Sequence, residues 1–534
     1  MSTGIAAYSY DSLGRLVQVT FPNGAQAIYS YDSMGNRTTV LEVPATITPD
    51  CCPPTVSALP KSLHGDLLNS AMMVKLSTGE LIGWGDNTTG ALANGVAAAT
   101  NAPAQRLLFD PNTTLPPFDA TIVDWSFTNA NLYVVFSNGW VYSAGKNDYG
   151  QLGHGDTVAR PQLKRIEYFV TQGKSITKVW ALGGFYSTNG GGCVYFQASD
   201  FNMYGCGANT SGNLGNAATP TSNVSTPAPC AGIPITPNHV VDVAIGVVNN
   251  LEFSAFMLFD NGALKVAGDN GTGQLGIGST TNQTGSFVDA KKTGSVPITN
   301  VASVSANGGR SSTTNGGNAL VVDTSGNVWT TGYNAQGQLG LSDTTQRTLF
   351  TQVTALSNIT KAEIGGGRTS YAYALNAAGQ LYTWGYNGQN NLFRNNTTTP
   401  VSTPSLAPFV PGVISKVFFP NGDGLSSSGA QLIVLTTSGQ LTYAGADNGQ
   451  IGIDSAVNPG AYKYIPTPRQ FLDGTETIAD IFVHGSQGTQ RLFILSNTGN
   501  LYACGSNLDS ICTGGVASDV MAANVLWFKI NFSR

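Results

Sequence analysis

The sequence repeats itself at an interval of about 60 residues from residue 85 to its end. The core of the repeat is a glycine, an asparagine two residues later and a Gln-Leu-Gly turn, and it is clearest in residues 145–153, 268–276 and 332–340. The leading glycines of the copies are Gly85, Gly145, Gly207, Gly268, Gly332, Gly385, Gly445 and Gly505. Their successive spacings are 60, 62, 61, 64, 53, 60 and 60 residues. A period as regular as this indicates a propeller or a solenoid rather than a series of unrelated domains.

Each copy also predicts short strands. A second glycine precedes the first by six residues in seven copies, and Phe201 takes this place in the third. Apolar segments of period two flank it, which is the pattern of a β-hairpin. A further apolar segment precedes each hairpin, as at Ile359–Ile364 and Val240–Ile245. A fourth strand is expected after the Gln-Leu-Gly turn, at Pro161–Phe169 or Arg347–Val353.

The strands define the fold class. A sheet of three or four short strands with two apolar faces cannot bury both faces alone, but a ring of such sheets can. A linear solenoid would need polar end caps, which the terminal copies lack. We therefore predict an all-β chain that folds as a closed β-propeller of eight blades, with seven blades as the alternative. The tryptophans of the strands (Trp84, Trp140, Trp329 and Trp384) are expected in the core.

The spacing and residues resemble those of the regulator-of-chromosome-condensation repeat family, whose members are propellers, usually of seven blades. The shared pattern is a hairpin glycine followed by Trp-Gly-x-Asn-x-x-Gly-Gln-Leu-Gly. This chain departs from it because only Trp84 and Trp384 retain the tryptophan. The other copies carry Ala144, Cys206, Ala267, Thr331, Ala444 and Cys504.

Residues 8–40 contain a different repeat. Tyr8-Ser9-Tyr10-Asp11 recurs 21 residues later as Tyr29-Ser30-Tyr31-Asp32. This resembles the rearrangement-hotspot, or YD, repeat of bacterial shell-forming toxin and surface proteins, although fewer than two repeats are present. The resemblance implies a strand–turn–strand unit and a bacterial origin, but no encapsulating shell.

The two repeats imply a division of the chain. We expect a YD-repeat β-hairpin segment in residues 1–45, a linker in residues 46–57 and the propeller in residues 58–534. An isolated hairpin is marginally stable and its edges offer unpaired backbone groups. We therefore expect the segment to dock on the propeller, a partner or another copy. The candidate docking residues are Tyr10, Asp11, Tyr31 and Asp32.

The last strand of the sequence predicts how the ring closes. Residues 524–532 alternate apolar and other side chains. This alternation places four apolar side chains on one face of the strand: Leu526, Phe528, Ile530 and Phe532. We expect this strand to pair in the blade where the first and last copies meet.

Composition limits the partners. Only 10% of residues are charged, against about 25% in typical globular proteins. The net charge is −5 and no run of Lys or Arg occurs, so nothing would attract a nucleic acid. Apolar stretches are too short to span a membrane. The first ten residues lack the pattern of a secretory signal peptide.

Reactive groups are sparse. The four histidines (His64, His154, His239 and His484) are dispersed, so neither a hydrolytic triad nor a zinc site is expected. Turn aspartates such as Asp86 and Asp156 are interpreted as caps of their own backbone rather than calcium ligands. Strand register places Val194, not Cys193, opposite Cys206, which argues against a disulfide there. Cys504 and Cys512 flank one turn and would pair only in an oxidising compartment.

These observations predict a protein without catalytic, cofactor-binding or metal-binding residues. The leading hypothesis is a bacterial binding or assembly module whose N-terminal segment docks on a protein partner or another copy, with filaments as one outcome. A carbohydrate-binding propeller is one alternative, and a guanine-nucleotide exchange or chromatin-binding propeller is another. The neutral polar surface favours the cell surface or non-classical secretion, with the cytoplasm as the alternative.

Overall fold

A computed structural model gives the conformation of most of the chain. It describes residues 7–10, 16–20, 26–31, 37–43, 55–59, 71–97, 102–128, 130–182, 192–234, 238–249, 252–309, 316–366, 370–408, 410, 412–418, 431–445, 463–465, 471, 474–484, 491–505 and 528–530. Two compact units result, one of residues 1–54 with 532–534 and one of residues 55–531.

The first unit contains a four-stranded antiparallel sheet in the order β1-β2-β3-β4. Its strands are β1 (Ala7–Tyr10), β2 (Leu16–Thr20), β3 (Gln26–Tyr31) and β4 (Arg37–Val43). Each YD repeat thus supplies two strands, and the segment expected as a small hairpin is a pair of consecutive hairpins.

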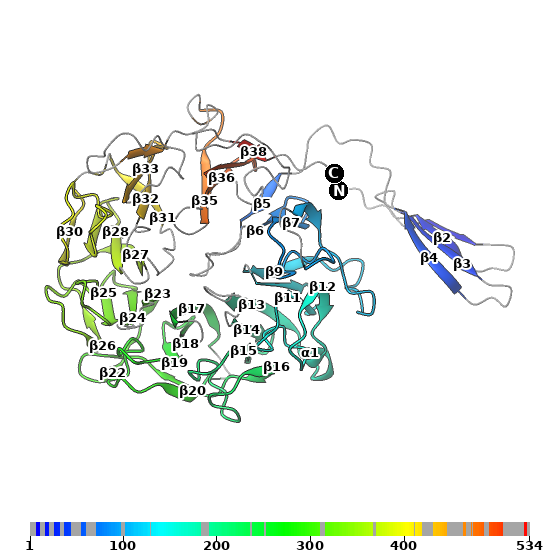
Figure 1. Cartoon of the computed structure of the whole chain (residues 1–534), viewed down its shortest axis with the longest axis horizontal. Coiled ribbons are helices and arrows are strands. Elements are labelled where there is room, and N and C mark those ends of the chain that lie inside the picture. Colours follow the sequence, from blue (N-terminus) through cyan, green and yellow to red (C-terminus); the bar gives the residue numbers. More distant parts are fainter. Residues whose placement is uncertain are drawn as a thin grey trace. The chain divides into compact units, whose positions relative to one another are not determined.

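The second unit is a propeller of eight blades, as the repeat predicted (Figure 1). Blade 1 contains β5 (Val56–Ala58), β6 (Ala71–Leu76), β7 (Leu81–Gly85) and β8 (Ala102–Arg106). Blade 2 contains β9 (Ile122–Phe127), β10 (Asn131–Phe136), β11 (Val141–Gly145) and β12 (Arg160–Arg165). Blade 3 contains β13 (Ile176–Leu182), β14 (Cys193–Ala198), β15 (Met203–Gly207) and β16 (Val224–Pro229). Blade 4 contains β17 (Val240–Asn249), β18 (Glu252–Phe259), β19 (Leu264–Gly268) and β20 (Gln283–Asp289).

The other four blades follow the same order. Blade 5 contains β23 (Val301–Gly309), β24 (Gly316–Asp323), β25 (Val328–Gly332) and β26 (Arg347–Gln352), and β21 (Lys291–Lys292) and β22 (Val296–Pro297) extend its outer edge. Blade 6 contains β27 (Ile359–Gly365), β28 (Tyr371–Asn376), β29 (Leu381–Gly385) and β30 (Val401–Leu406). Blade 7 contains β31 (Ile414–Phe418), β32 (Gln431–Thr436), β33 (Leu441–Gly445) and β34 (Lys463–Ile465). Blade 8 contains β35 (Ile478–His484), β36 (Arg491–Ser496), β37 (Leu501–Gly505) and β38 (Phe528–Ile530).

Two expected boundaries differ from the structure. The strand expected at Pro161–Phe169 ends at Arg165, and the short helix α1 (Glu167–Thr171) follows it. The first propeller strand, β5, begins at Val56, inside the segment expected as a linker. Among the described residues, no helix is long and apolar enough to cross a membrane.

The leading glycines have a geometric cause. Gly145, Gly207, Gly268 and Gly332 end the third strand of their blades at φ values of +102° to +114°, which L side chains rarely adopt. A Cβ at Gly145 would also lie 2.1 Å from the carbonyl oxygen of Ala130. The repeat therefore retains glycine here for both its backbone angle and its lack of a side chain.

The hydrophobic core lies between the faces of neighbouring blades. One cluster, for example, joins Leu320 of β24 to Trp384 of β29. The indole Nε1 of Trp384 donates to the carbonyl oxygen of Gln338 in the Gln-Leu-Gly turn of the preceding blade, at 2.8 Å. Cys206 holds the tryptophan position in blade 3, and its Sγ donates to the carbonyl oxygen of Gln151 at 3.3 Å. The replacement of tryptophan by Cys206 therefore does not abolish this contact between blades 2 and 3.

The innermost strands of neighbouring blades lie side by side around the axis (Figure 1). A repeated hydrogen bond also links blade to blade. The N–H of the first residue of an innermost strand donates to the carbonyl oxygen of the hairpin glycine in the preceding blade. This bond measures 2.9 Å from Ile176 to Gly139 and 3.0 Å from Val301 to Gly262.

The outer strands of blades 2 to 6 are protected at one equivalent position. In three blades the chain arriving from the preceding blade pairs with this residue, which is Leu163, Phe287 or Phe350. In the other two blades the residue is Pro227 or Pro404, which has no N–H to leave unpaired. Covered or proline-bearing edges resist strand addition by another chain.

Candidate interaction site

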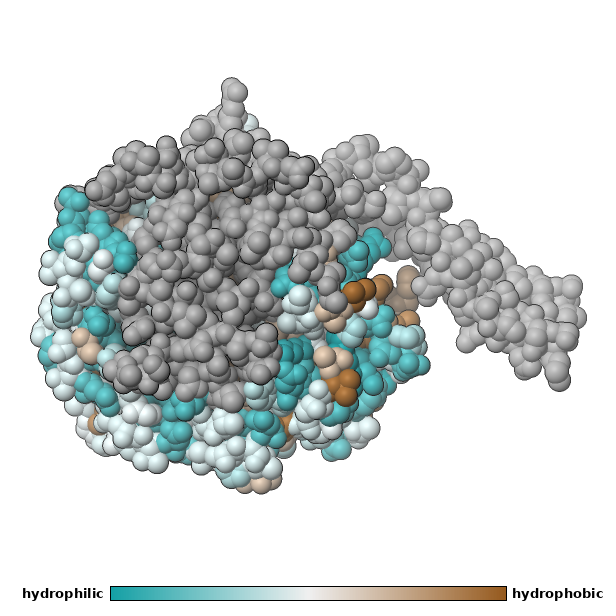
Figure 2. All heavy atoms as spheres, viewed as in Figure 1, coloured by the Kyte–Doolittle hydropathy of each residue, from teal (hydrophilic) through white to brown (hydrophobic). Residues whose placement is uncertain are grey.

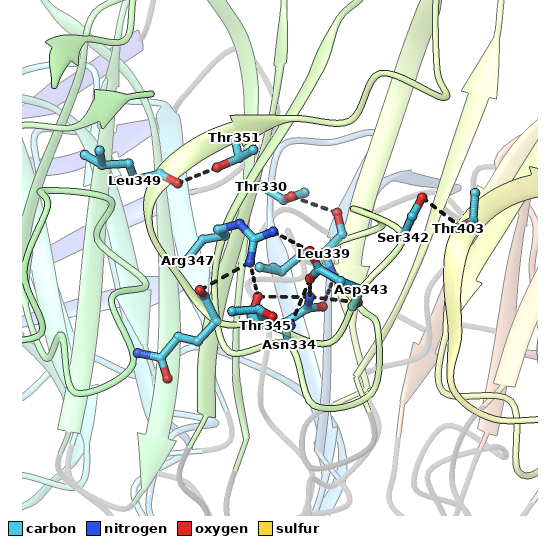
Figure 3. Close-up of polar contacts among 11 residues, drawn as sticks. Thr330, Asn334, Leu339, Ser342, Asp343, Thr345, Arg347, Leu349, Thr351 and Thr403 are labelled. Carbon is cyan, nitrogen blue, oxygen red and sulfur yellow. Dashed lines mark hydrogen bonds and ion pairs between the residues drawn. The ribbon is translucent and has the colours of Figure 1, made fainter. Parts of the chain in front are cut away.

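The polar residues that recur in the repeat form hydrogen bonds within its loops, as blade 5 shows (Figure 3). The Oδ1 of Asn334 accepts from the N–H of Leu339 at 2.9 Å. Its Nδ2 donates to the carbonyl oxygens of Asp343 and Thr345 at 3.0 and 3.1 Å. Arg347 closes the same loop through an ion pair of 2.6 Å with Asp343. These groups satisfy one another, so the motif builds the scaffold rather than a reactive site.

Aspartates of the turns behave as backbone caps. The Oδ1 of Asp86 accepts from the N–H of Thr88 at 2.8 Å, and that of Asp156 accepts from the N–H of Val158 at 3.0 Å. Hydrogen bonding to Arg160 lowers the pKa of Asp156 to about 2. Asp447 lies outside the described residues. The described residues contain no group of three or more His, Cys, Asp or Glu side chains suited to a metal ion.

One serine and one histidine meet in blade 2, but not as a nucleophile and a base. Ser143 Oγ lies 3.0 Å from His154 Nε2 and donates its own proton to the carbonyl oxygen of Leu152 at 2.8 Å. Nε2 must therefore be the donor to Ser143, so the imidazole cannot accept the hydroxyl proton. Burial lowers the pKa of His154 to about 3 and keeps the ring neutral. Thr330 and Thr383 make the same hydroxyl contact in blades 5 and 6.

The cysteines of blade 3 follow the predicted register. Val194 lies opposite Cys206, and Cys193 lies opposite Gly207. Both thiols are buried and free, and burial raises the pKa of Cys193 to about 12. Such thiols remain protonated and weakly reactive. Cys512 lies outside the described residues, so the pairing of Cys504 with Cys512 stays a prediction.

Two of the four tryptophans expected in the core are fully buried, Trp84 and Trp384. Trp140 and Trp329 are partly buried and pack against core clusters, and each also lies beneath a cation. The Cζ of Arg165 is 4.2 Å from the Trp140 ring centroid, and the Nζ of Lys292 is 5.4 Å from that of Trp329. The expectation is thus confirmed in full for Trp84 and Trp384, whereas Trp140 and Trp329 pack at the margin of the core, where an indole face can pair with a cation as well as with apolar atoms.

The innermost strands of the blades carry both acidic and basic side chains. In six blades the third residue of the innermost strand is charged: Asp124, Lys178, Asp242, Lys361, Lys416 and Asp480. Three acids and three bases in a ring cancel at a distance and do not form a basic surface. Such a lining gives a polyanion no net attraction.

Apolar side chains gather on blades 1 and 2 (Figure 2). Six of the eleven exposed large hydrophobic side chains among the described residues lie between residues 96 and 158. They are Val96, Leu108, Leu115, Phe118, Val123 and Val158. Elsewhere the described surface is mostly polar, so this gathering, called the apolar rim below, is of the kind that contacts other proteins.

The candidate docking residues lie only partly in the described chain. Tyr10 ends β1 and Tyr31 ends β3, whereas Asp11 and Asp32 lie outside the described residues. The sheet order leaves β1 and β4 at the two edges, and no described strand pairs with their outer sides. Sequence reasoning located the segment but missed its four-stranded form, because only the paired register distinguishes two hairpins from one.

Two of the four residues expected to close the ring lie in the last blade. Phe528 and Ile530 belong to β38, which pairs antiparallel with β37, and Ile530 is buried. Leu526 and Phe532 lie outside the described residues. Every propeller tyrosine whose burial is described is buried or half-buried.

Comparison with known proteins identifies both repeats. The regulator of chromosome condensation (RCC1) repeat matches residues 138–187 and 325–370, and the RHS repeat matches residues 10–43. The ultraviolet-B receptor UVR8 of Arabidopsis thaliana is 25% identical over 402 residues, which cover 66% of this chain and 83% of the receptor. The X-linked retinitis pigmentosa GTPase regulator of Homo sapiens is 31% identical over 158 residues, which cover 29% of this chain. That match spans only 14% of the human protein's length.

Solved structures are similar at lower identity. Human WBSCR16 is 18% identical and covers 74% of this chain and 94% of its own, with a TM-score of 0.49. Prp20p of Saccharomyces cerevisiae, described with its binding to Gsp1p and histones, is 15% identical and covers 86% of this chain and 94% of its own, with a TM-score of 0.46. The chain is thus an eight-bladed propeller that resembles those built from regulator-of-chromosome-condensation repeats, with an RHS repeat in its N-terminal sheet.

Proposed function

We propose that this chain is a non-enzymatic binding and assembly module, in which the N-terminal sheet docks on another protein by strand addition and the propeller serves as a rigid scaffold. The observation that carries the proposal is the contrast between edges. In blades 2 to 6 the propeller protects its outer strands with pairing or proline, as at Leu163 and Pro227. Among the described residues, no strand pairs with the outer sides of the N-terminal sheet and neither edge strand contains a proline, and β1 (AYSY) is also uncharged.

The chemistry of the described residues supports a binding role. The serine–histidine pair of blade 2 is fixed by the carbonyl oxygen of Leu152, and the thiols of blade 3 are buried. Strand addition needs only backbone N–H and C=O groups, with side chains setting the register. The RHS repeat and the sparsely charged surface support a bacterial cell-surface or secreted setting for this docking.

The test compares the full chain with a version that begins at Thr55, where the second compact unit starts. We expect the full chain to associate as its concentration rises, by light scattering and negative-stain microscopy. The shortened chain should remain monomeric with an unchanged melting temperature. Thr344→Ala, at an exposed position of the propeller outside the apolar rim, is the matched control and should not affect this association.

The proposal is wrong if both chains stay monomeric across the concentration range and capture the same proteins from a lysate of the source organism. Cell fractionation with an antibody against the propeller tests the setting separately. Recovery exclusively in the cytosolic fraction would contradict a surface or secreted location without affecting the docking role.

A further inference from the structure

The N-terminal sheet consists of two copies of one hairpin. The 21-residue repeat relates Tyr8 to Tyr29, so β1 and β3 come from the same part of the repeat. By the same shift, β2 and β4 are equivalent. The sheet therefore alternates two kinds of strand, with a strand of the first kind at one edge and a strand of the second kind at the other.

The junction between the two hairpins is the pairing of β2 with β3. It is antiparallel and places Gln18 opposite Ile28 and Val19 opposite Ala27. The outer side of β4 is the repeat equivalent of the side of β2 that faces β3. Likewise, the outer side of β1 is equivalent to the side of β3 that faces β2. The two edges of the sheet are thus the two halves of a junction that the sheet already makes internally.

We propose that β4 of one copy pairs antiparallel with β1 of a second copy of this chain. This inference rests on the proposed docking function and names its partner. Shifting the internal register by one repeat places Thr39 of the first copy opposite Ala7 of the second. Because each copy uses one β4 edge and one β1 edge, the contact is heterologous and continues from copy to copy unless it closes into a ring.

The irregularity in β1 does not prevent this pairing. The register of β1 with β2 shifts between Ser9 and Tyr10. The register of β3 with β4 shifts at the equivalent place, between Ser30 and Tyr31, and β3 nevertheless pairs with β2 on its other side. In this register Thr38 and Arg37 of β4 lie opposite Tyr8 and Ser9, and because β1 is uncharged, no like charges face each other.

Edge-blocking variants of the full chain test the proposal. Backbone N–H groups of a strand point alternately to its two sides, so one of two adjacent prolines blocks the outer edge and spares the internal pairing. Tyr8→Pro and Ser9→Pro are made for β1, and Thr39→Pro and Val40→Pro for β4. The variant of each pair that retains the wild-type melting temperature is used.

We expect each blocked variant alone to remain a monomer by light scattering. A mixture of the two should give a species of twice the monomer mass and nothing larger. One variant retains only its β4 edge and the other only its β1 edge, so each chain can pair once. A mixture of wild-type chain with either variant should shorten the wild-type assemblies. Association of a single blocked variant with itself would overturn the head-to-tail arrangement.

Cross-linking tests the register even if proline disturbs the sheet. Residues directly opposite in an antiparallel pair have Cα atoms about 4.5–5.5 Å apart, which a disulfide can span. Chains with Thr39→Cys and chains with Ala7→Cys are mixed and oxidised, and the linked peptides are identified by mass spectrometry. The control pairs Thr39→Cys with Tyr10→Cys, which the register separates. Equal yields in both mixtures would overturn the proposed register.

The outcomes separate this inference from the proposed function. If removal of residues 1–54 changes no association, both are wrong. If that removal abolishes binding to a different protein while the full chain alone stays monomeric at every concentration, docking stands and pairing between copies is wrong. Complementation of the blocked variants together with the Thr39–Ala7 cross-link supports both.

Discussion

The backbone N–H of Val56, in the first strand of the propeller, donates to the carbonyl oxygen of Gly499, the hairpin glycine of the last blade, at 2.8 Å. The same bond joins consecutive blades, for example Ile359 to Gly326 at 3.0 Å. The approach is close, because a Cβ at Gly499 would lie 2.6 Å from Cβ of Thr55. Blade 8 therefore meets blade 1 through the contact used inside the ring.

This relationship predicts the effect of shortening the chain. A version that begins at Thr55 keeps the Val56–Gly499 bond and should retain the wild-type melting temperature. A version that begins at Pro60 loses β5 and the residue after it, and with them the buried side chains of Val56 and Leu59. At about 1.5–3 kcal/mol for each buried aliphatic side chain, the loss should be about 3–6 kcal/mol, which is measurable by urea unfolding. Equal stability of the two versions would contradict closure through β5.

The C-terminal strand gives a second prediction. Ile530 lies opposite Leu501 in blade 8, as Ile465 lies opposite Leu441 in blade 7, and both isoleucines are buried. Replacing either by alanine removes similar apolar contacts and should cost about 2–5 kcal/mol. If β38 also closes the ring, Ile530→Ala should lower the melting temperature more than Ile465→Ala. Equal effects would reduce β38 to an ordinary outer strand.

The regular part of the fold was predictable from the sequence because it depends on local geometry. Glycines at fixed spacing located the hairpins, and period-two segments located strands such as β27 (Ile359–Gly365). Phe201 shows the limit of this approach. It occupies a hairpin position that holds glycine in the other blades, and it adopts φ = +65° while stacking on His239 with centroids 5.0 Å apart. A long-range contact thus accompanies a conformation that its residue type disfavours.

The features that the sequence did not reveal depend on pairing between distant segments. The parallel contact of Lys292 with Phe350 adds two strands to blade 5, and no local pattern marks it. The protection of outer strands has no local pattern either, because Leu163 and Pro227 are related only by their equivalent positions in the strand pairing. In the candidate docking site, the repeat located the strands, but only the register of β2 with β3 related the two edges to each other.

The third prediction concerns the loop of blade 5 (Figure 3). Asn334→Ala removes the acceptor of the buried Leu339 N–H and the donor to two carbonyl oxygens. Leaving a buried group unsatisfied costs about 1–3 kcal/mol, so we expect a loss of at least that size in urea unfolding. Thr344→Ala, at an exposed position of the same loop, is the control and should stay within about 0.5 kcal/mol of wild type. Similar values for the two variants would show that the asparagine does not hold the loop.

The last prediction is a loss of stability in mild acid that originates at His154. Burial lowers the pKa of His154 from 6.5 to about 3 in the folded chain, whereas the unfolded chain retains the ordinary value. Below pH 6.5 the unfolded chain therefore binds a proton that the folded chain excludes, and the free energy of unfolding falls by about 1.4 kcal/mol per pH unit. From neutral pH to about pH 5 the loss should be about 2 kcal/mol.

His154→Asn is the matched control, because Asn216 occupies the equivalent position, nine residues after the leading glycine, in blade 3. The pKa of Asp156, at about 2, leaves this neighbour ionised over the whole range, so it does not contribute. Urea unfolding at both pH values should show the loss in the wild type and a smaller loss, by about 2 kcal/mol, in His154→Asn. The same pH dependence in both proteins would mean that His154 is protonated equally in the folded and unfolded chain.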